Sequence, residues 1–145
     1  MLGIGFFYHG WPKVFSAQGH RGFAGMLGSL GVPAPETTAW LVGSAEIVGG
    51  LALLAGAFVA VAGVVLIADM LVATFTVHAP HGFNFINITG MGPQGPVFGM
   101  PGAEVNLLYI SGLLALVIAG AGAWSVDTLL QDRKGRASTS PGPER

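Results

Sequence analysis

The stretch AWLVGSAEIVGGLALLAGAFVAVAGVVLIADMLVATFTVHA, residues 39–79, decides the fold of this chain. Its only formally charged side chains are Glu46 and Asp69. A membrane-spanning helix needs about 20 predominantly apolar residues, so the stretch has the length of about two spans. Because a run of this length has to turn, we expect two helices joined by a very short loop, with the break at Gly56.

The composition of the whole chain agrees with a membrane protein. Of its 145 residues, 52% are hydrophobic and only 9% are charged, whereas soluble domains carry roughly 25% charged residues. We therefore expect the lipid bilayer to be the main partner of the surface. The net charge of −1 gives no indication of a nucleic-acid partner. The absence of cysteine excludes disulfides and dithiol chemistry within this chain.

Two further apolar stretches flank the central one. Residues 1–15, MLGIGFFYHGWPKVF, are too short to cross a hydrocarbon core of roughly 30 Å, so we expect the first helix to be short or truncated, with residues missing upstream of Met1. Residues 104–124 have the length of one span. The sequence thus predicts an all-α, four-helix transmembrane bundle over residues 1–130, with a disordered tail at 131–145.

The connections and the tail predict the orientation. Residues 16–38 and 80–103 are rich in Gly and Pro and are expected to form two long loops. The basic residues Arg133, Lys134 and Arg136 follow the last span, which predicts a cytoplasmic C-terminus and places both long loops on the outer face. Alanines at four-residue spacing on the last span (Ala115, Ala119 and Ala123) predict close contacts between helices.

Several polar residues stand inside the apolar stretches. A charged side chain at the bilayer centre costs at least roughly 2.5–3.5 kcal/mol on insertion scales, so such residues are expected to face the bundle interior. The predicted topology brings most of them to the outer half of the bundle. They form either a buried ion-pair network that fixes the packing of the helices or a polar pocket. The residues are His9, Lys13, Glu46, Asp69, His78, Glu104, Asn106 and Asp127.

Three segments of the chain resemble motifs of the DoxX family. FFYHGWPKVF (residues 6–15) is similar to the family's first helix, which ends in His-Gly with a Lys shortly after. GVPAPETTAWLVGSAEIVGGLALLAG (residues 31–56) looks like the second motif, with an intramembrane Glu and a Gly-Gly pair. EVNLLYISGLLALVIAGAGAWSVDTLL (residues 104–130) is similar to the last helix. The positions that match are His9, Gly10, Lys13, Glu46, Gly50, Glu104 and Asp127.

The resemblance implies a multi-pass protein of the bacterial cytoplasmic membrane, of a family whose members are commonly labelled oxidoreductases. Together with the polar cluster, it leads us to expect a redox subunit that handles a quinone. In this hypothesis His9, Lys13 and Glu46 are the catalytic groups. The quinone pocket contains His9, Glu46, His78 and Glu104. The electrons come from another cofactor or from a redox protein partner, and the chain itself can form oligomers.

Other functions stay open at this point. The chain is alternatively a non-catalytic anchor or assembly subunit for a partner redox enzyme, with the polar cluster as structural support. A further alternative is a transporter for a proton or a small solute, which Glu46 and Asp69 motivate. A haem held by His9 and His78 is less favoured than a quinone, and no metal site is expected at His78, His81 and Glu104.

Overall fold

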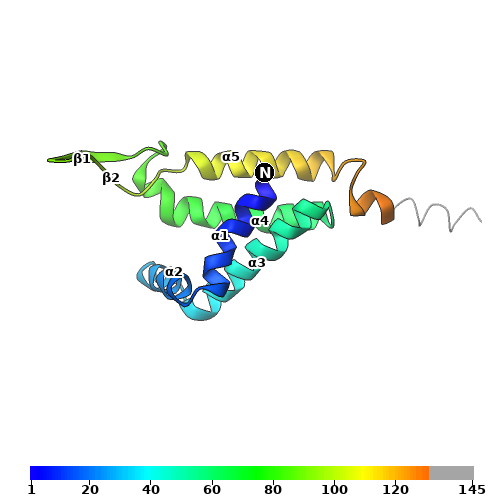
Figure 1. Cartoon of the computed structure of the whole chain (residues 1–145), viewed down its shortest axis with the longest axis horizontal. Helices are drawn as coiled ribbons and strands as arrows, with labels where there is room; N and C mark the ends of the chain where they lie inside the picture. Colours follow the sequence, from blue (N-terminus) through cyan, green and yellow to red (C-terminus); the bar gives the residue numbers. More distant parts are fainter. Residues whose placement is uncertain (131–145) are drawn as a thin grey trace, which may run out of the picture.

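The computed structural model describes residues 1–130, and these residues are mostly helical (Figure 1). The predicted tail at 131–145, with Arg133, Lys134 and Arg136, lies outside the described residues. The helices and strands run in the order α1 (Leu2–Phe15), α2 (Ala17–Ser29), α3 (Pro35–Ala55), α4 (Val59–Ala73), the π-helical turn η1 (Thr74–His78), the 3₁₀ turn η2 (Ala79–His81), β1 (Ile88–Gly92), β2 (Gly95–Phe98) and α5 (Glu104–Ala119).

The central apolar stretch forms α3 and α4, and the predicted break at Gly56 is confirmed. Gly56 ends α3 in the left-handed conformation, with a φ of 64°, which glycine adopts without steric cost. Phe58 also has a positive φ, 50°, where a side chain is strained. The chain therefore reverses over three residues, and α4 returns along α3.

Asp127, which lies far along the chain, stabilises the turn between α3 and α4. Its two carboxylate oxygens accept the backbone N–H groups of Phe58 and Val59, at 2.7 and 3.0 Å. The first N–H groups of a helix have no partner within the helix, and negative charge is favourable there. The N–H of Asp127 donates to the carbonyl of Gly56 at 3.0 Å. Asp127 is thus an N-terminal cap for α4.

Helices α1 and α3 cross where glycines of one helix lie against glycines of the other. A Cβ added at Gly10 would lie 2.8 Å from the carbonyl oxygen of Gly43, and one added at Gly3 would lie 2.6 Å from that of Gly50. Real Cβ atoms do not approach a backbone oxygen so closely, so both positions on α1 require glycine. Close backbone approach at small residues is the usual way in which helices associate in lipid.

The helices form two pairs, α1 with α3 and α4 with α5. Helices α3 and α4 meet near Gly56 and diverge toward the opposite end (Figure 1). Phe6, Leu66 and Leu113 fill the space between the pairs and are almost fully buried. Beyond this core, the diverging helices leave room for a cavity.

Several predictions about the connections and the last helix were wrong. Residues 17–29 form α2 rather than a loop, because Ser16 caps the helix by accepting the N–H of Gly19 at 3.1 Å. The second predicted loop contains the antiparallel β1–β2 hairpin, which projects beyond α4 and α5 (Figure 1). Helix α5 ends at Ala119 instead of Trp124. The predicted alanine contact stripe (Ala115, Ala119 and Ala123) is exposed instead.

The number of membrane spans stays a prediction. Among the described residues, two helices are long and apolar enough to cross a membrane, Pro35–Ala55 with 21 residues and Val59–His81 with 23. Helices α1 and α5 have 14 and 16 residues. At about 1.5 Å per residue they are shorter than a hydrocarbon core of roughly 30 Å. The mostly helical fold class is confirmed, but four complete spans are not.

Candidate functional site

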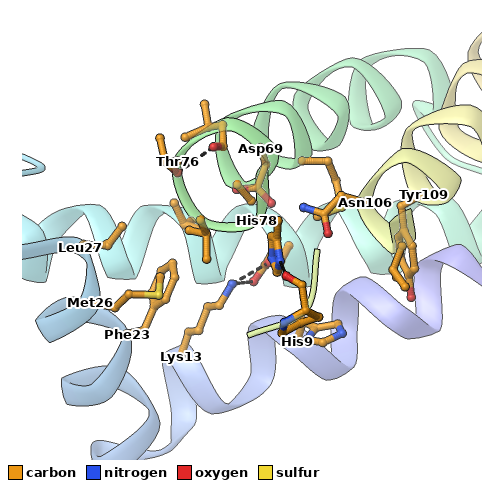
Figure 2. Close-up of a pocket in the computed structure, with 18 of the residues that line it drawn as sticks. His9, Lys13, Phe23, Met26, Leu27, Asp69, Thr76, His78, Asn106 and Tyr109 are labelled. Carbon is orange, nitrogen blue, oxygen red and sulfur yellow. Dashed lines mark hydrogen bonds and ion pairs between the residues drawn. The ribbon is translucent and has the colours of Figure 1, made fainter. Parts of the chain in front are cut away.

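A cavity of about 630 Å³ lies where the two helix pairs diverge (Figure 2). Helices α1 and α3 form one wall, α4 with η1 and α5 form the other, and α2 and the segment after β2 cover the end. The lining is mainly apolar, with polar side chains reaching in from four helices. The apolar residues include Phe6, Phe23, Met26, Leu27, Val42, Met70, Met100 and Tyr109, and the polar ones include His9, Lys13, Glu46, Asp69, His78 and Asn106.

On the α1–α3 wall, Lys13 and Glu46 form a bidentate ion pair. The ammonium nitrogen Nζ of Lys13 lies 2.7 Å from Oε1 and 2.6 Å from Oε2 of Glu46. Nζ also lies 4.2 Å from the centroid of the Phe23 ring, in a cation–π contact. Because Glu46 is buried, this pairing offsets the cost of placing its charge in an apolar wall.

The glycine crossing of α1 and α3 creates this pair. A Cβ added at Gly10 would lie 2.9 Å from Cβ of Glu46, and one added at Gly43 would lie 2.8 Å from Cβ of Lys13. Only the missing side chains allow the two backbones to come this close. The ion pair therefore depends on the glycines at the helix crossing.

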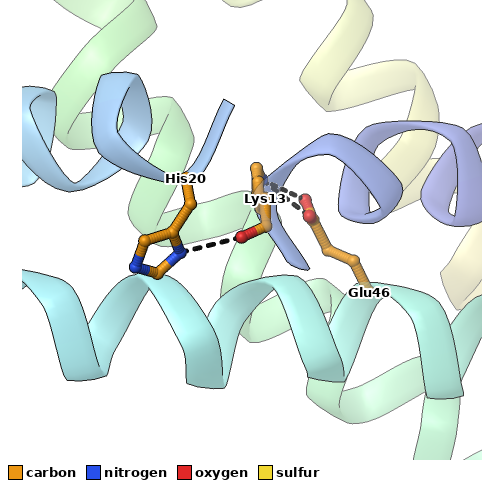
Figure 3. A network of polar contacts seen from close by, with 3 residues as sticks. All are labelled: Lys13, His20 and Glu46. Atoms are coloured by element: carbon orange, nitrogen blue, oxygen red, sulfur yellow. Dashed lines mark hydrogen bonds and ion pairs between the residues drawn. The ribbon is translucent and has the colours of Figure 1, made fainter. Parts of the chain in front are cut away.

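His20 holds helix α2 against α1, next to the ion pair (Figure 3). Its Nδ1 donates to the carbonyl oxygen of Lys13 at 2.8 Å, and its Nε2 lies 2.8 Å from Oε2 of Glu36. The ring also packs on Trp40, with 4.7 Å between the centroids. These contacts hold Phe23 and Leu27 of α2 over the cavity. Sequence reasoning missed His20, although the Ser16 cap and the spacing of His20, Ala24 and Leu27 are signals of an amphipathic helix.

On the opposite wall, a distorted turn presents His78. The turn η1 is π-helical, and such single π turns are frequent at functional sites. The Nδ1 of His78 donates to the carbonyl oxygen of Pro101 at 2.9 Å. The segment that follows β2 is thereby tied to α4. In a neutral ring with the proton on Nδ1, Nε2 is left as an acceptor.

The structure brings together four of the five site residues that the sequence predicted. His9, Lys13, Glu46 and His78 all line the cavity, although His9 is exposed and stands at its rim. Glu104 does not line it. Its Oε2 accepts the N–H of Phe85 at 2.9 Å, so the carboxylate holds the start of the hairpin segment instead.

Two further cavity residues were not among the predicted catalytic and quinone-binding residues. Asp69 and Asn106 reach toward one another from α4 and α5 (Figure 2). Their polarity inside apolar stretches was visible, but their convergence depends on how α4 and α5 pack. Among the described residues, no three His, Asp or Glu side chains cluster closely enough to hold a metal ion.

The fold and the cavity define a class: a helical membrane protein with a mainly apolar internal cavity that carries a few convergent polar groups. The chain belongs to the DoxX family, because the DoxX family model matches residues 1–79, more than half of its length. The match covers α1 to η1 and thus His9, Lys13, Glu46, Asp69 and His78. No curated protein and no solved structure matches the chain.

Proposed function

We propose that this protein is a quinone-binding subunit of a membrane oxidoreductase in the bacterial cytoplasmic membrane. The observation that carries the proposal is the cavity between the helix pairs, about 630 Å³ in volume. Sites for small organic ligands are typically concave, mostly apolar and about 300–1,000 Å³, with a few polar groups that fix orientation. A quinone needs this combination, because its ring is flat and apolar and its two oxygens are polar.

The lining residues fit such a ligand. When bound, a quinone supplies two-electron chemistry, taking up two electrons and two protons to become the quinol. Aromatic and thioether side chains, among them Phe6, Phe23 and Met70, form an apolar surface on which the ring can pack. His78 has its Nδ1 occupied by Pro101, and its Nε2 accepts a proton from a ligand hydroxyl or, once protonated, returns it.

The closed inner end of the cavity favours this function over a transporter. Phe6, Leu66 and Leu113 pack between the helix pairs with exposed fractions of 2%, 0% and 0%. Phe6 is at once part of this core and part of the cavity lining. A path for a solute would have to pass this core, whereas a ligand that enters and leaves on one side does not.

A second function, docking of a partner redox protein, is favoured by the hairpin. Residues 79–103 carry no Asp, Glu, Lys or Arg, and the hairpin exposes large apolar side chains, including Met91, Val97 and Phe98. Met100, which follows β2, lines the cavity. A partner seated on the hairpin would therefore stand next to the ligand and deliver electrons to it from its own cofactor.

A matched pair of variants on α3 tests the quinone site. Val42 lines the cavity, and Val48 is 66% exposed. We expect the wild-type protein in lipid nanodiscs to bind decylubiquinone saturably, Val42→Trp to lose this binding and Val48→Trp to keep it. Thermal unfolding of both variants checks that they are folded. Equal binding by folded Val42→Trp and the wild type would remove the cavity as the site.

Photo-crosslinking tests the docking function. A photoreactive residue placed at Met91 of the hairpin should give an adduct in native membranes with a protein that carries flavin, haem or an iron–sulfur cluster. The control is the same residue at Tyr8, which is exposed on α1. Adducts from both positions, or from neither, would contradict docking through the hairpin.

A further inference from the structure

Asn106 has an unpaired donor inside the cavity. Its side chain is 5% exposed, and Nδ2 is the buried side-chain nitrogen that has no hydrogen-bond partner among residues 1–130. The residue lies in the first turns of α5 and lines the cavity, where it points toward Asp69 of α4 (Figure 2). Buried polar groups are nearly always hydrogen-bonded, so this amide needs an explanation.

The amide nitrogen makes no hydrogen bond in the free protein, although Asp69 lies on the facing helix. Met70 and Tyr109, which also line this part of the cavity, pack against the apolar core of Phe6, Leu66 and Leu113. A buried donor without a partner costs stability, whereas an apolar side chain of the same shape is neutral or stabilising. Leucine would therefore suit the free protein as well as asparagine or better. The missing partner is what a ligand would supply.

Two other donors of the cavity, Lys13 and His78, are already engaged. Lys13 binds both carboxylate oxygens of Glu46 and faces the Phe23 ring. His78 directs its Nδ1 to the carbonyl of Pro101. Among residues 1–130, the amide of Asn106 is the buried side-chain donor that is left to meet a hydrogen-bond acceptor.

We infer that the amide nitrogen of Asn106 donates a hydrogen bond to a carbonyl oxygen of the bound ligand and thereby favours the quinone over the quinol. The inference rests on the proposed function and makes it more specific. A quinone oxygen only accepts hydrogen bonds, while a quinol hydroxyl also has a proton to donate. Because Asn106 borders the apolar core, the ligand ring lies at the inner end of the cavity.

The test compares two variants of Asn106 in nanodiscs, with decylubiquinone and its quinol form as probes under anaerobic conditions. Asn106→Leu keeps the approximate shape and removes the donor, so it should raise the Kd for the quinone about tenfold. Its ligand-free Tm should be equal to that of the wild type or higher. Asn106→Met removes the donor with a second apolar shape, and both variants should shift the quinone-to-quinol preference toward the quinol.

The control and the contradicting outcomes separate this inference from the proposed function. Ser111→Ala, on the exposed side of the same helix where the hydroxyl donates to the carbonyl of Leu107, should bind both probes like the wild type. Quinone binding by Asn106→Leu within about twofold of the wild type overturns this inference alone. A ligand-free Tm several degrees lower in Asn106→Leu also overturns it, because the amide is then structural. No saturable binding in the wild type overturns both.

Discussion

The two ends of the helix assembly differ in how its helices meet. At the closed end, around Gly56, helices contact one another directly: Asp127 caps α4, and Leu66 and Leu113 are fully buried. At the open end, the same helices diverge and enclose the cavity with Lys13, Glu46 and His78 on its walls. One end holds packed apolar and backbone groups, and the other holds polar groups and unfilled volume.

The difference shows where stability and function reside in this molecule. A cavity loses packing contacts, and buried polar groups cost free energy unless they are paired. Packing at the closed end and at the glycine crossing of α1 and α3 offsets the free-energy cost of the cavity and of the buried polar groups at the open end. Substitutions at the closed end should therefore change stability and leave ligand binding intact, and those at Asn106 should do the reverse.

The largest effect is expected at the ion pair. Lys13→Met leaves Glu46 buried without its cation, and breaking such a pair destabilises proteins by about 3–5 kcal/mol. The double variant Lys13→Met/Glu46→Leu should recover most of the loss, because apolar replacement of a whole buried pair is often neutral or stabilising. Thermal and denaturant unfolding in mild detergent measure both. A single variant as stable as the wild type would show that the pair does not support the open end.

The next effect concerns the crossing of α1 and α3. Gly10→Ala brings a Cβ to 2.8 Å from the carbonyl of Gly43, and overpacking of this kind costs about 1–3 kcal/mol. Gly25→Ala is the matched control, because a Cβ there meets nothing within 4 Å. The control should stabilise α2 by up to about 1 kcal/mol, since alanine is the better helix former. Equal unfolding midpoints for the two variants would contradict the close crossing.

Much of this fold was predictable from the sequence. The apolar run at residues 39–79 predicted two helices, and the left-handed requirement after α3 made Gly56 the break. The DoxX resemblance also proved correct, and His9, Lys13, Glu46 and His78 do line one cavity. These features depend on local composition, on helix length and on the rule that polar groups in apolar helices face inward.

The features that were missed depend on tertiary contacts. Residues 17–29 were interpreted as a loop because of their glycines. The Ser16 cap is a local helix signal, and the contacts of His20 with Lys13 and Glu36 add the tertiary support that the sequence does not show. The alanines of α5 were expected to contact a helix, and composition alone does not tell a small residue that faces a helix from one that does not. The partners of Asp127 lie 68 and 69 residues away in the chain, and no local pattern indicates them.

A smaller effect is expected at the cap of α4. Asp127→Ala removes the acceptor from the N–H groups of Phe58 and Val59, and loss of an N-terminal cap costs about 0.5–2 kcal/mol. Asp127→Asn keeps one oxygen acceptor and should lose less. Because the cap is at the closed end, the Kd for decylubiquinone should not change in either variant. A large loss of affinity in Asp127→Ala would mean that the two ends are coupled.

The smallest effect is expected at Glu36. This carboxylate pairs with His20 at 2.8 Å, but its side chain is 68% exposed, and exposed ion pairs contribute about 0–1 kcal/mol. Glu36→Gln keeps an acceptor oxygen and should lower stability by less than about 0.5 kcal/mol. His20→Leu is the contrasting variant, because it also removes the hydrogen bond to the carbonyl of Lys13 and should loosen α2 over the cavity. Increased hydrogen exchange across α2 in His20→Leu, without it in Glu36→Gln, would assign the fastening of α2 to the buried contact. The opposite pattern would place it at the exposed pair.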